Sequence, residues 1–106
     1  MAKRVVVTGL GIVCPVGIGV AETWKGLCAG TSGIGRITRF DTTGYETQIA
    51  GEVKGFKAED WVSKKEAKRF ELFISYAIAA TRMAVDDARL AITADNGDRI
   101  GVITGC

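Results

Sequence analysis

The hydrophobic positions near the N-terminus form an unbroken run. Residues 4–8 read RVVVT, and β-branched residues without polar alternation are typical of a strand covered on both faces. A glycine-rich connection over residues 9–19 follows. Apolar residues then recur at helical spacing, which predicts a helix over residues 20–28. One face of that helix carries Ala21, Trp24 and Leu27.

The next segment changes to glycines and turn-forming residues. Residues 30–46 contain Gly30, Gly33 and Gly35 followed by RFDTTGYE, which predicts a loop. Residues 47–53 predict a short strand, although Gly51 interrupts it.

The strongest helix pattern lies further along the chain. Ser63 and Glu66 have the spacing of a capping box. They predict a helix from residue 63 to about residue 90, with room for a break. Most of its circumference is apolar, which predicts a buried helix. The polar positions that share one narrow stripe are Lys68, Glu71, Ser75, Arg82, Asp86 and Arg89.

The last residues predict a turn or short capped helix over 93–99 and a second covered strand over 99–106. Two covered strands and a buried helix need packing layers on every side, and 106 residues supply few helices. We therefore expect the chain to be part of something larger or to fold against a partner. Alone in dilute buffer it should be aggregated or molten, and a cooperative melt as a monomer would contradict this.

Composition limits the function classes. The 106 residues make at most one small domain, and a net charge of +2 is too slight to indicate a nucleic-acid partner. There is no histidine, so the usual general base and the commonest metal ligand are missing, and we expect no metal site. The apolar run over residues 5–21 is too short for a membrane helix and holds Pro15 and several glycines, which predicts no membrane insertion.

The three cysteines are Cys14, Cys28 and Cys106. Their odd number and the lack of a C-x-x-C spacing argue against a disulfide framework or a zinc site and favour a reducing, cytoplasmic setting. Their apolar or glycine-rich surroundings favour buried thiols that act as small hydrophobic residues.

The glycines after the first run invite comparison with a dinucleotide-binding fingerprint. Gly9 and Gly11 fit its first two positions, but Cys14 occupies the third and Pro15 follows at once. No acidic residue lies near position 31. We therefore expect no cofactor, although saturable NADH or FAD binding would revive that interpretation.

Charged residues gather in three places. Two adjacent acidic pairs, at residues 59–60 and 86–87, point apart on a helix and are expected to be solvated. The segment SKKEAKR, residues 63–69, puts four cations into the first two turns of the predicted helix, the unfavourable end for positive charge. It is either a solvated face or a docking surface for an anionic partner.

Taken in order, four segments resemble one family. RVVVTGLGIVCPVG, TWKGLCAGTSGIGRITRFDTTGYETQIAGEVKGF, SKKEAKRFELFISYAIAATRMAVDDA and RIGVITG are similar to the N-terminal region of β-ketoacyl-acyl carrier protein synthases. They are most similar to the elongating type II enzyme of bacterial fatty-acid synthesis. The resemblance implies an α/β fold in which residues 1–106 form the N-terminal segment of a thiolase-like, layered α/β/α/β/α domain.

The resemblance also implies an activity. The parent enzyme, a cytoplasmic homodimer, would condense a malonyl thioester on the acyl carrier protein with an enzyme-bound acyl chain, losing carbon dioxide. The family's nucleophilic cysteine and two histidines match no residue here, so we expect no catalytic residue within this chain and no activity from it alone. The family's carrier-protein-binding cations match Lys65, Lys68 and Arg69, and Lys64 adjoins them. Cys106 would neighbour the glycine-rich segment that shapes the acyl pocket.

One alternative stays open. The chain could belong to a non-catalytic relative, such as a chain-length-factor-type partner or a carrier-protein binder. An active member must supply the downstream cysteine and both histidines, so the residues that follow would distinguish the two. The acyl-chain length and the choice between fatty-acid and polyketide pathways also stay open.

Overall fold

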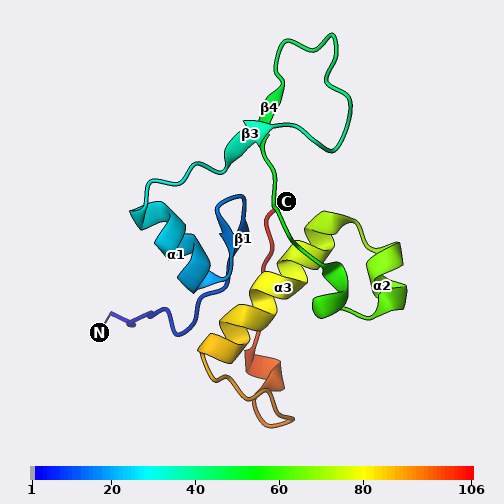
Figure 1. Cartoon of the computed structure of the whole chain (residues 1–106). Helices are drawn as coiled ribbons and strands as arrows, with labels where there is room; N and C mark the ends of the chain where they lie inside the picture. Colours follow the sequence, from blue (N-terminus) through cyan, green and yellow to red (C-terminus); the bar gives the residue numbers. More distant parts are fainter. Residues whose placement is uncertain (1) are drawn as a thin grey trace.

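The computed structural model describes residues 2–106 (Figure 1). Its N-terminal part holds a small antiparallel hairpin, β1 (Val13–Cys14) and β2 (Gly17–Ile18), followed by helix α1 (Val20–Cys28). The predicted helix over residues 20–28 is therefore confirmed. The hairpin lies inside the segment that the sequence predicted as a glycine-rich connection without strands. Pro15 and Val16 form the turn that joins its two strands.

Helix α1 buries a polar residue and exposes its apolar face. Thr23 is buried, whereas Trp24 and Leu27 are 66% and 55% exposed. The face that packs against β2 contains Thr23, whose main-chain N–H donates to the Gly19 carbonyl. The apolar side of α1 consequently has no covering layer within residues 2–106.

A second hairpin follows. Strands β3 (Ile34–Arg36) and β4 (Ile49–Gly51) pair antiparallel, with Gly35 opposite Ala50. The strand predicted over residues 47–53 is confirmed in its centre. The loop predicted over residues 30–46 was wrong at β3, since strand pairing supplies what local propensity does not.

The long predicted helix is two helices. Helix α2 (Lys64–Arg69) ends where Phe70 turns to extended dihedrals, and α3 (Leu72–Asp87) begins after Glu71. The capping box of Ser63 and Glu66 is confirmed. A short 3-10 turn, η1 (Ala58–Asp60), packs against both helices, and η2 (Gly97–Arg99) lies within the turn predicted near the C-terminus.

The two predicted core strands are wrong in this structure. Residues 4–8 and 99–106 carry no strand assignment and are almost entirely exposed; Val5 and Ile103 are 94% and 99% exposed. A strand needs a neighbour that shares its main-chain hydrogen bonds, and neither segment has one within residues 2–106. Residues 102–106 instead run beside α3 (Figure 1).

The arrangement is open. The radius of gyration is 17.1 Å, against about 13 Å for a compact domain of this length. The accessible surface of 8879 Å² exceeds the roughly 5,700 Å² of a compact protein of this mass. The predicted mixed α/β content is confirmed, whereas the five-layer arrangement stays a prediction.

Helix α3 is less buried than its apolar composition predicted. Only Ser75 and Ala79 of this helix are fully buried, and Leu72 and Phe73 are 41% and 58% exposed. Ser75 belongs to the predicted polar stripe, so that stripe does not simply face solvent. No helix within residues 2–106 is long and apolar enough to cross a membrane.

Candidate functional site

The four cations of α2 form an exposed basic surface. Lys64, Lys65, Lys68 and Arg69, hereafter the basic surface, are all solvent-exposed. The break after Arg69 corrects one expectation. Because α2 is short, Lys68 and Arg69 lie in its last turn, where the negative end of the helix dipole favours positive charge. Lys64 and Lys65 remain at the unfavourable first turn.

The capping box orders the helix that carries these cations. The Ser63 Oγ accepts a hydrogen bond from the Glu66 N–H at 3.2 Å, and the Ser63 N–H donates to Glu66 Oε2 at 2.9 Å. The Ser63 hydroxyl also donates to that carboxylate at 2.8 Å. These bonds and the nearby charge of Arg82 hold the pKa of Glu66 below its usual value, against a smaller opposing effect of burial. The one acid within α2 is therefore engaged inside the helix.

The basic surface rests on a packed support. Val62, directly before the cap, is buried, and its N–H donates to the Ala58 carbonyl of η1 at 3.0 Å. Since η1 packs against both α2 and α3, the surface is attached to the longest helix of the chain. Structured support keeps the cations in one arrangement instead of scattering them along a loop.

Cys106 lies beside α3. It lines a hollow of about 440 Å³ together with Thr104, Gly105 and the α3 residues Phe73, Ile74 and Ala77. The Cys106 thiol is exposed. The structure thus places Cys106 at an apolar concavity, and separately from the basic surface on α2.

The expectation of three buried thiols was wrong. Cys28, at the end of α1, and Cys106 are exposed, and Cys14 is half-buried; all three are free. Burial raises the pKa of Cys14, but hydrogen bonds with the Thr23 hydroxyl and the main chain of Val16 and Gly17 outweigh it and leave the pKa below its ordinary value. The distance from Cys14 Sγ to Thr23 Oγ1 is 3.6 Å.

The glycines after the first apolar run pack closely against helix α3. A Cβ at Gly9 would collide with the Ala84 carbonyl oxygen, and one at Gly11 with that of Ala80. Between them, the Leu10 N–H donates to Asp87 Oδ2 at 2.9 Å. The Leu10 main-chain donor is therefore taken by a carboxylate of α3. Asp87 is exposed as predicted, but it is not merely solvated.

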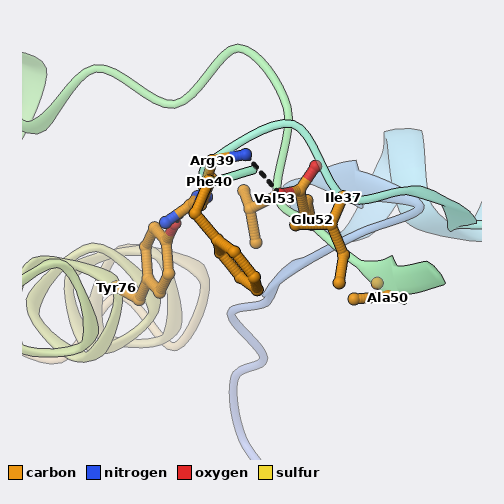
Figure 2. Close-up of a pocket in the computed structure, with 8 residues that line it drawn as sticks. Ile37, Arg39, Phe40, Ala50, Glu52, Val53 and Tyr76 are labelled. Atoms are coloured by element: carbon orange, nitrogen blue, oxygen red, sulfur yellow. Dashed lines mark hydrogen bonds between the residues drawn. The ribbon is translucent and has the colours of Figure 1, made fainter. Parts of the chain in front are cut away.

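Sequence reasoning missed a polar and aromatic cluster at the second hairpin. The Arg39 Nη2 donates to the Tyr76 hydroxyl at 2.9 Å, linking the β3–β4 loop to α3 (Figure 2). This bond raises the pKa of the Arg39 guanidinium. Glu52 accepts hydrogen bonds from the main chain of Thr38 and Arg39 and from the Thr38 hydroxyl. No local pattern could indicate this cluster, because it depends on the pairing of β3 with β4 and on a contact between residues 37 positions apart.

No group of three or more His, Cys, Asp or Glu side chains within residues 2–106 is arranged to hold a metal ion. Chemically, the described part of the chain therefore offers an exposed cationic surface, an apolar hollow beside Cys106 and the hairpin cluster. None of these pairs a nucleophile with a base.

Comparison with known proteins gives consistent matches. Residues 2–106 match the family described as "Beta-ketoacyl synthase, N-terminal domain". The chain is 50% identical over 103 residues to 3-oxoacyl-[acyl-carrier-protein] synthase 2 of Vibrio cholerae, and equally to the protein of that name from Staphylococcus aureus strain COL. Each match covers 97% of this chain but 25% of the relative, so the chain spans about a quarter of their length.

A solved structure is similar as well. The ishigamide ketosynthase/chain length factor matches with a TM-score of 0.70 and 44% sequence identity. That match covers 81% of this chain and 21% of the other.

Proposed function

The chain belongs to the β-ketoacyl synthase family, and we propose that residues 1–106 are the N-terminal segment of a condensing enzyme of fatty-acid elongation. The parent enzyme would join a malonyl group on the acyl carrier protein to an enzyme-bound acyl chain, with loss of carbon dioxide. The similarity to two proteins named 3-oxoacyl-[acyl-carrier-protein] synthase 2, each 50% identical, supports this reaction.

Within that enzyme, we assign this segment the docking of the carrier protein. The observation that supports this role is the basic surface, which places four exposed cations within six residues of one capped helix. An acidic partner would be attracted over a distance of about 10 Å at ordinary ionic strength, and opposite charges across an interface fix its orientation. The negative charge of Glu66 would repel such a partner only weakly, because its carboxylate is hydrogen-bonded to Ser63 within the cap.

The segment supplies no catalytic residue in this proposal. The Cys14 sulfur contacts Thr23 and donates to the Gly17 carbonyl at 3.5 Å, and the chain has no histidine to activate any thiol. Cys106, beside an apolar hollow, would instead lie next to the acyl chain. The chain alone would be inactive. The enzyme would act as a homodimer in the cytoplasm, where unpaired thiols such as these three persist.

Charge reversal tests the docking role. In the protein expressed from its complete reading frame, Lys65→Glu with Arg69→Glu should weaken binding of the acyl carrier protein about tenfold or more at low salt and flatten its salt dependence. The matched control is Lys3→Glu with Lys25→Glu, which makes the same change in net charge at exposed positions away from α2. Equal losses in both double variants, or none in the first, would refute the docking role.

One observation favours a second candidate. The similar solved structure is named for a ketosynthase/chain length factor, so a non-catalytic relative is the second candidate for this chain. The reading frame distinguishes the two, since a condensing enzyme must supply a nucleophilic cysteine and two histidines. Condensation of malonyl-carrier protein by the purified protein would support the enzyme, and carrier binding without turnover would support the non-catalytic relative.

A further inference from the structure

A hollow of about 300 Å³ lies between the second hairpin and α3, and is called the hairpin hollow below. Its apolar lining comes from Ile37, Phe40, Ala50 and Val53, which all belong to the hairpin and its flanks. Arg39 and Tyr76 stand at one end of it (Figure 2). A mainly apolar concavity with a few converging polar groups is the usual form of a small-molecule site, and this volume lies at the small end of the common range.

The polar end is held in place. The Tyr76 ring packs edge-to-face on Phe56, with ring centroids 4.8 Å apart. Its hydroxyl accepts the Arg39 Nη2 hydrogen bond at 2.9 Å, which leaves the phenolic proton free to donate. A guanidinium carries five N–H donors, and this is its single hydrogen bond within residues 2–106. The remaining N–H donors of Arg39 and the hydroxyl proton of Tyr76 therefore lie at the same end of the hollow.

Glu52 also lines the hollow, but it does not occupy these donors. Its carboxylate is bound by the Thr38 N–H, the Thr38 hydroxyl and the Arg39 N–H at 2.9–3.2 Å. In Figure 2 it faces the main chain of Arg39, whereas the guanidinium extends the opposite way, toward Tyr76. The one acid of the hollow is thus hydrogen-bonded by the loop, and it makes no hydrogen bond to the Arg39 guanidinium, although its charge still attracts that cation.

We propose that the hairpin hollow binds an aliphatic carboxylate. Its carboxylate would accept hydrogen bonds from the Arg39 guanidinium and the Tyr76 hydroxyl. Its hydrocarbon chain would lie along Phe40 and Val53 toward Ala50. This site is separate from the basic surface and does not depend on the docking role.

Both halves of the ligand are required by the chemistry of the hollow. A guanidinium binds a carboxylate with paired, charge-assisted hydrogen bonds, which are stronger than neutral ones. An inorganic anion would leave the apolar lining in contact with water, and an uncharged hydrocarbon would leave the free N–H donors of the guanidinium without an acceptor. An amphipathic anion satisfies the two ends together.

Octanoate is the probe for this proposal. Acetate tests the carboxylate without the long chain, and octan-1-ol tests the chain without the negative charge. Binding is followed by amide chemical-shift changes and by calorimetry in the protein expressed from its complete reading frame. Octanoate should bind at least about tenfold more tightly than acetate or octan-1-ol, and should change the amide chemical shifts of Phe40 and Val53. Arg39→Gln should weaken octanoate binding about tenfold or more, because a charge-assisted hydrogen bond is lost.

Two further variants separate binding from folding. Tyr76→Phe keeps the ring on Phe56 and should still weaken octanoate binding several-fold. Arg36→Gln is the matched control: this neighbouring exposed arginine donates to Gln48 and does not line the hollow, so its affinity for octanoate should be unchanged. Equal binding of octanoate and octan-1-ol, or wild-type affinity in both Arg39→Gln and Tyr76→Phe, would overturn the proposal. Loss of octanoate binding on reversal of Lys65 and Arg69 alone would also overturn it.

Discussion

Gly11 lies directly against the backbone of α3, where a Cβ would collide with the Ala80 carbonyl oxygen. Gly9 makes the corresponding approach one turn further along, at Ala84. The loop between them is tied to the end of α3 by the hydrogen bond from Leu10 to Asp87. The glycines that resemble a cofactor motif thus serve close packing of loop on helix.

This packing predicts a large cost for the smallest side chain at Gly11. Gly11→Ala should lower the free energy of unfolding by about 1–3 kcal/mol, since the new Cβ meets main-chain atoms of Ala80 and Ala84 and the Met83 Cβ, none of which can rotate away. Gly35→Ala is the control, because nothing lies within 4 Å of a Cβ at that position. Chemical denaturation measures both variants. Equal stability of the two would show that the loop can move away from α3.

The Glu52 carboxylate predicts a pH dependence of the second hairpin. The hydrogen bond from the Thr38 N–H, together with those from the Thr38 hydroxyl and the Arg39 N–H, outweighs burial and holds the pKa of Glu52 below its ordinary value. A lowered pKa means that the ionised group contributes its full stabilisation above its unfolded-state pKa, and that this contribution is lost as the pH falls from there through the folded-state pKa. The amides of Thr38 and Arg39 should therefore exchange faster with solvent, relative to other amides, as the pH falls through the acidic range in which the Glu52 carboxylate becomes protonated.

Glu52→Gln should remove this pH dependence of the hairpin. The control is Glu46→Gln in the same loop, because the Glu46 side chain makes no hydrogen bond within residues 2–106. Hydrogen exchange followed by NMR, normalised to an unstructured peptide at each pH, gives the comparison. An unchanged pH profile in Glu52→Gln would mean that another acid holds the loop.

The cap at Ser63 predicts a link between helix order and partner binding. Ser63→Ala should destabilise α2 by about 1 kcal/mol, the usual value of a lost N-cap. It should also weaken carrier-protein binding although no charge changes, because the basic surface loses its fixed arrangement. Ser63→Thr keeps the capping hydroxyl and should restore both properties. Amide exchange at Ala67, together with a binding titration, tests this, and full binding with a frayed α2 would contradict it.

Cys106 predicts an effect on acyl-chain length. If the hollow beside α3 receives part of the acyl chain, Cys106→Phe should fill it and lower kcat/KM for long acyl primers relative to short ones by about tenfold. The same replacement at Cys28, which is exposed at the end of α1, should leave the ratio unchanged. A uniform loss for all primers in Cys106→Phe would point to a folding defect, and an unchanged ratio would remove Cys106 from the pocket.

The family, α1, the capping box and the basic residues of α2 were determined by the sequence itself. Each of these is a local property: helical spacing over residues 20–28, a serine three residues before a glutamate, or cations within one heptad. The basic surface could be predicted for the same reason, since its four cations lie within six consecutive residues.

Only the tertiary structure decided the features that need a distant partner. Residues 4–8 and 99–106 have strand-forming sequences, but a strand exists only where a neighbour completes its hydrogen bonds. β3 formed because β4 lay opposite it, and Arg39 found Tyr76 across 37 positions of sequence. Gly11 is required by the nearness of Ala80, which no local pattern specifies. Local spacing fixes which groups a segment can present, and long-range packing fixes what those groups meet.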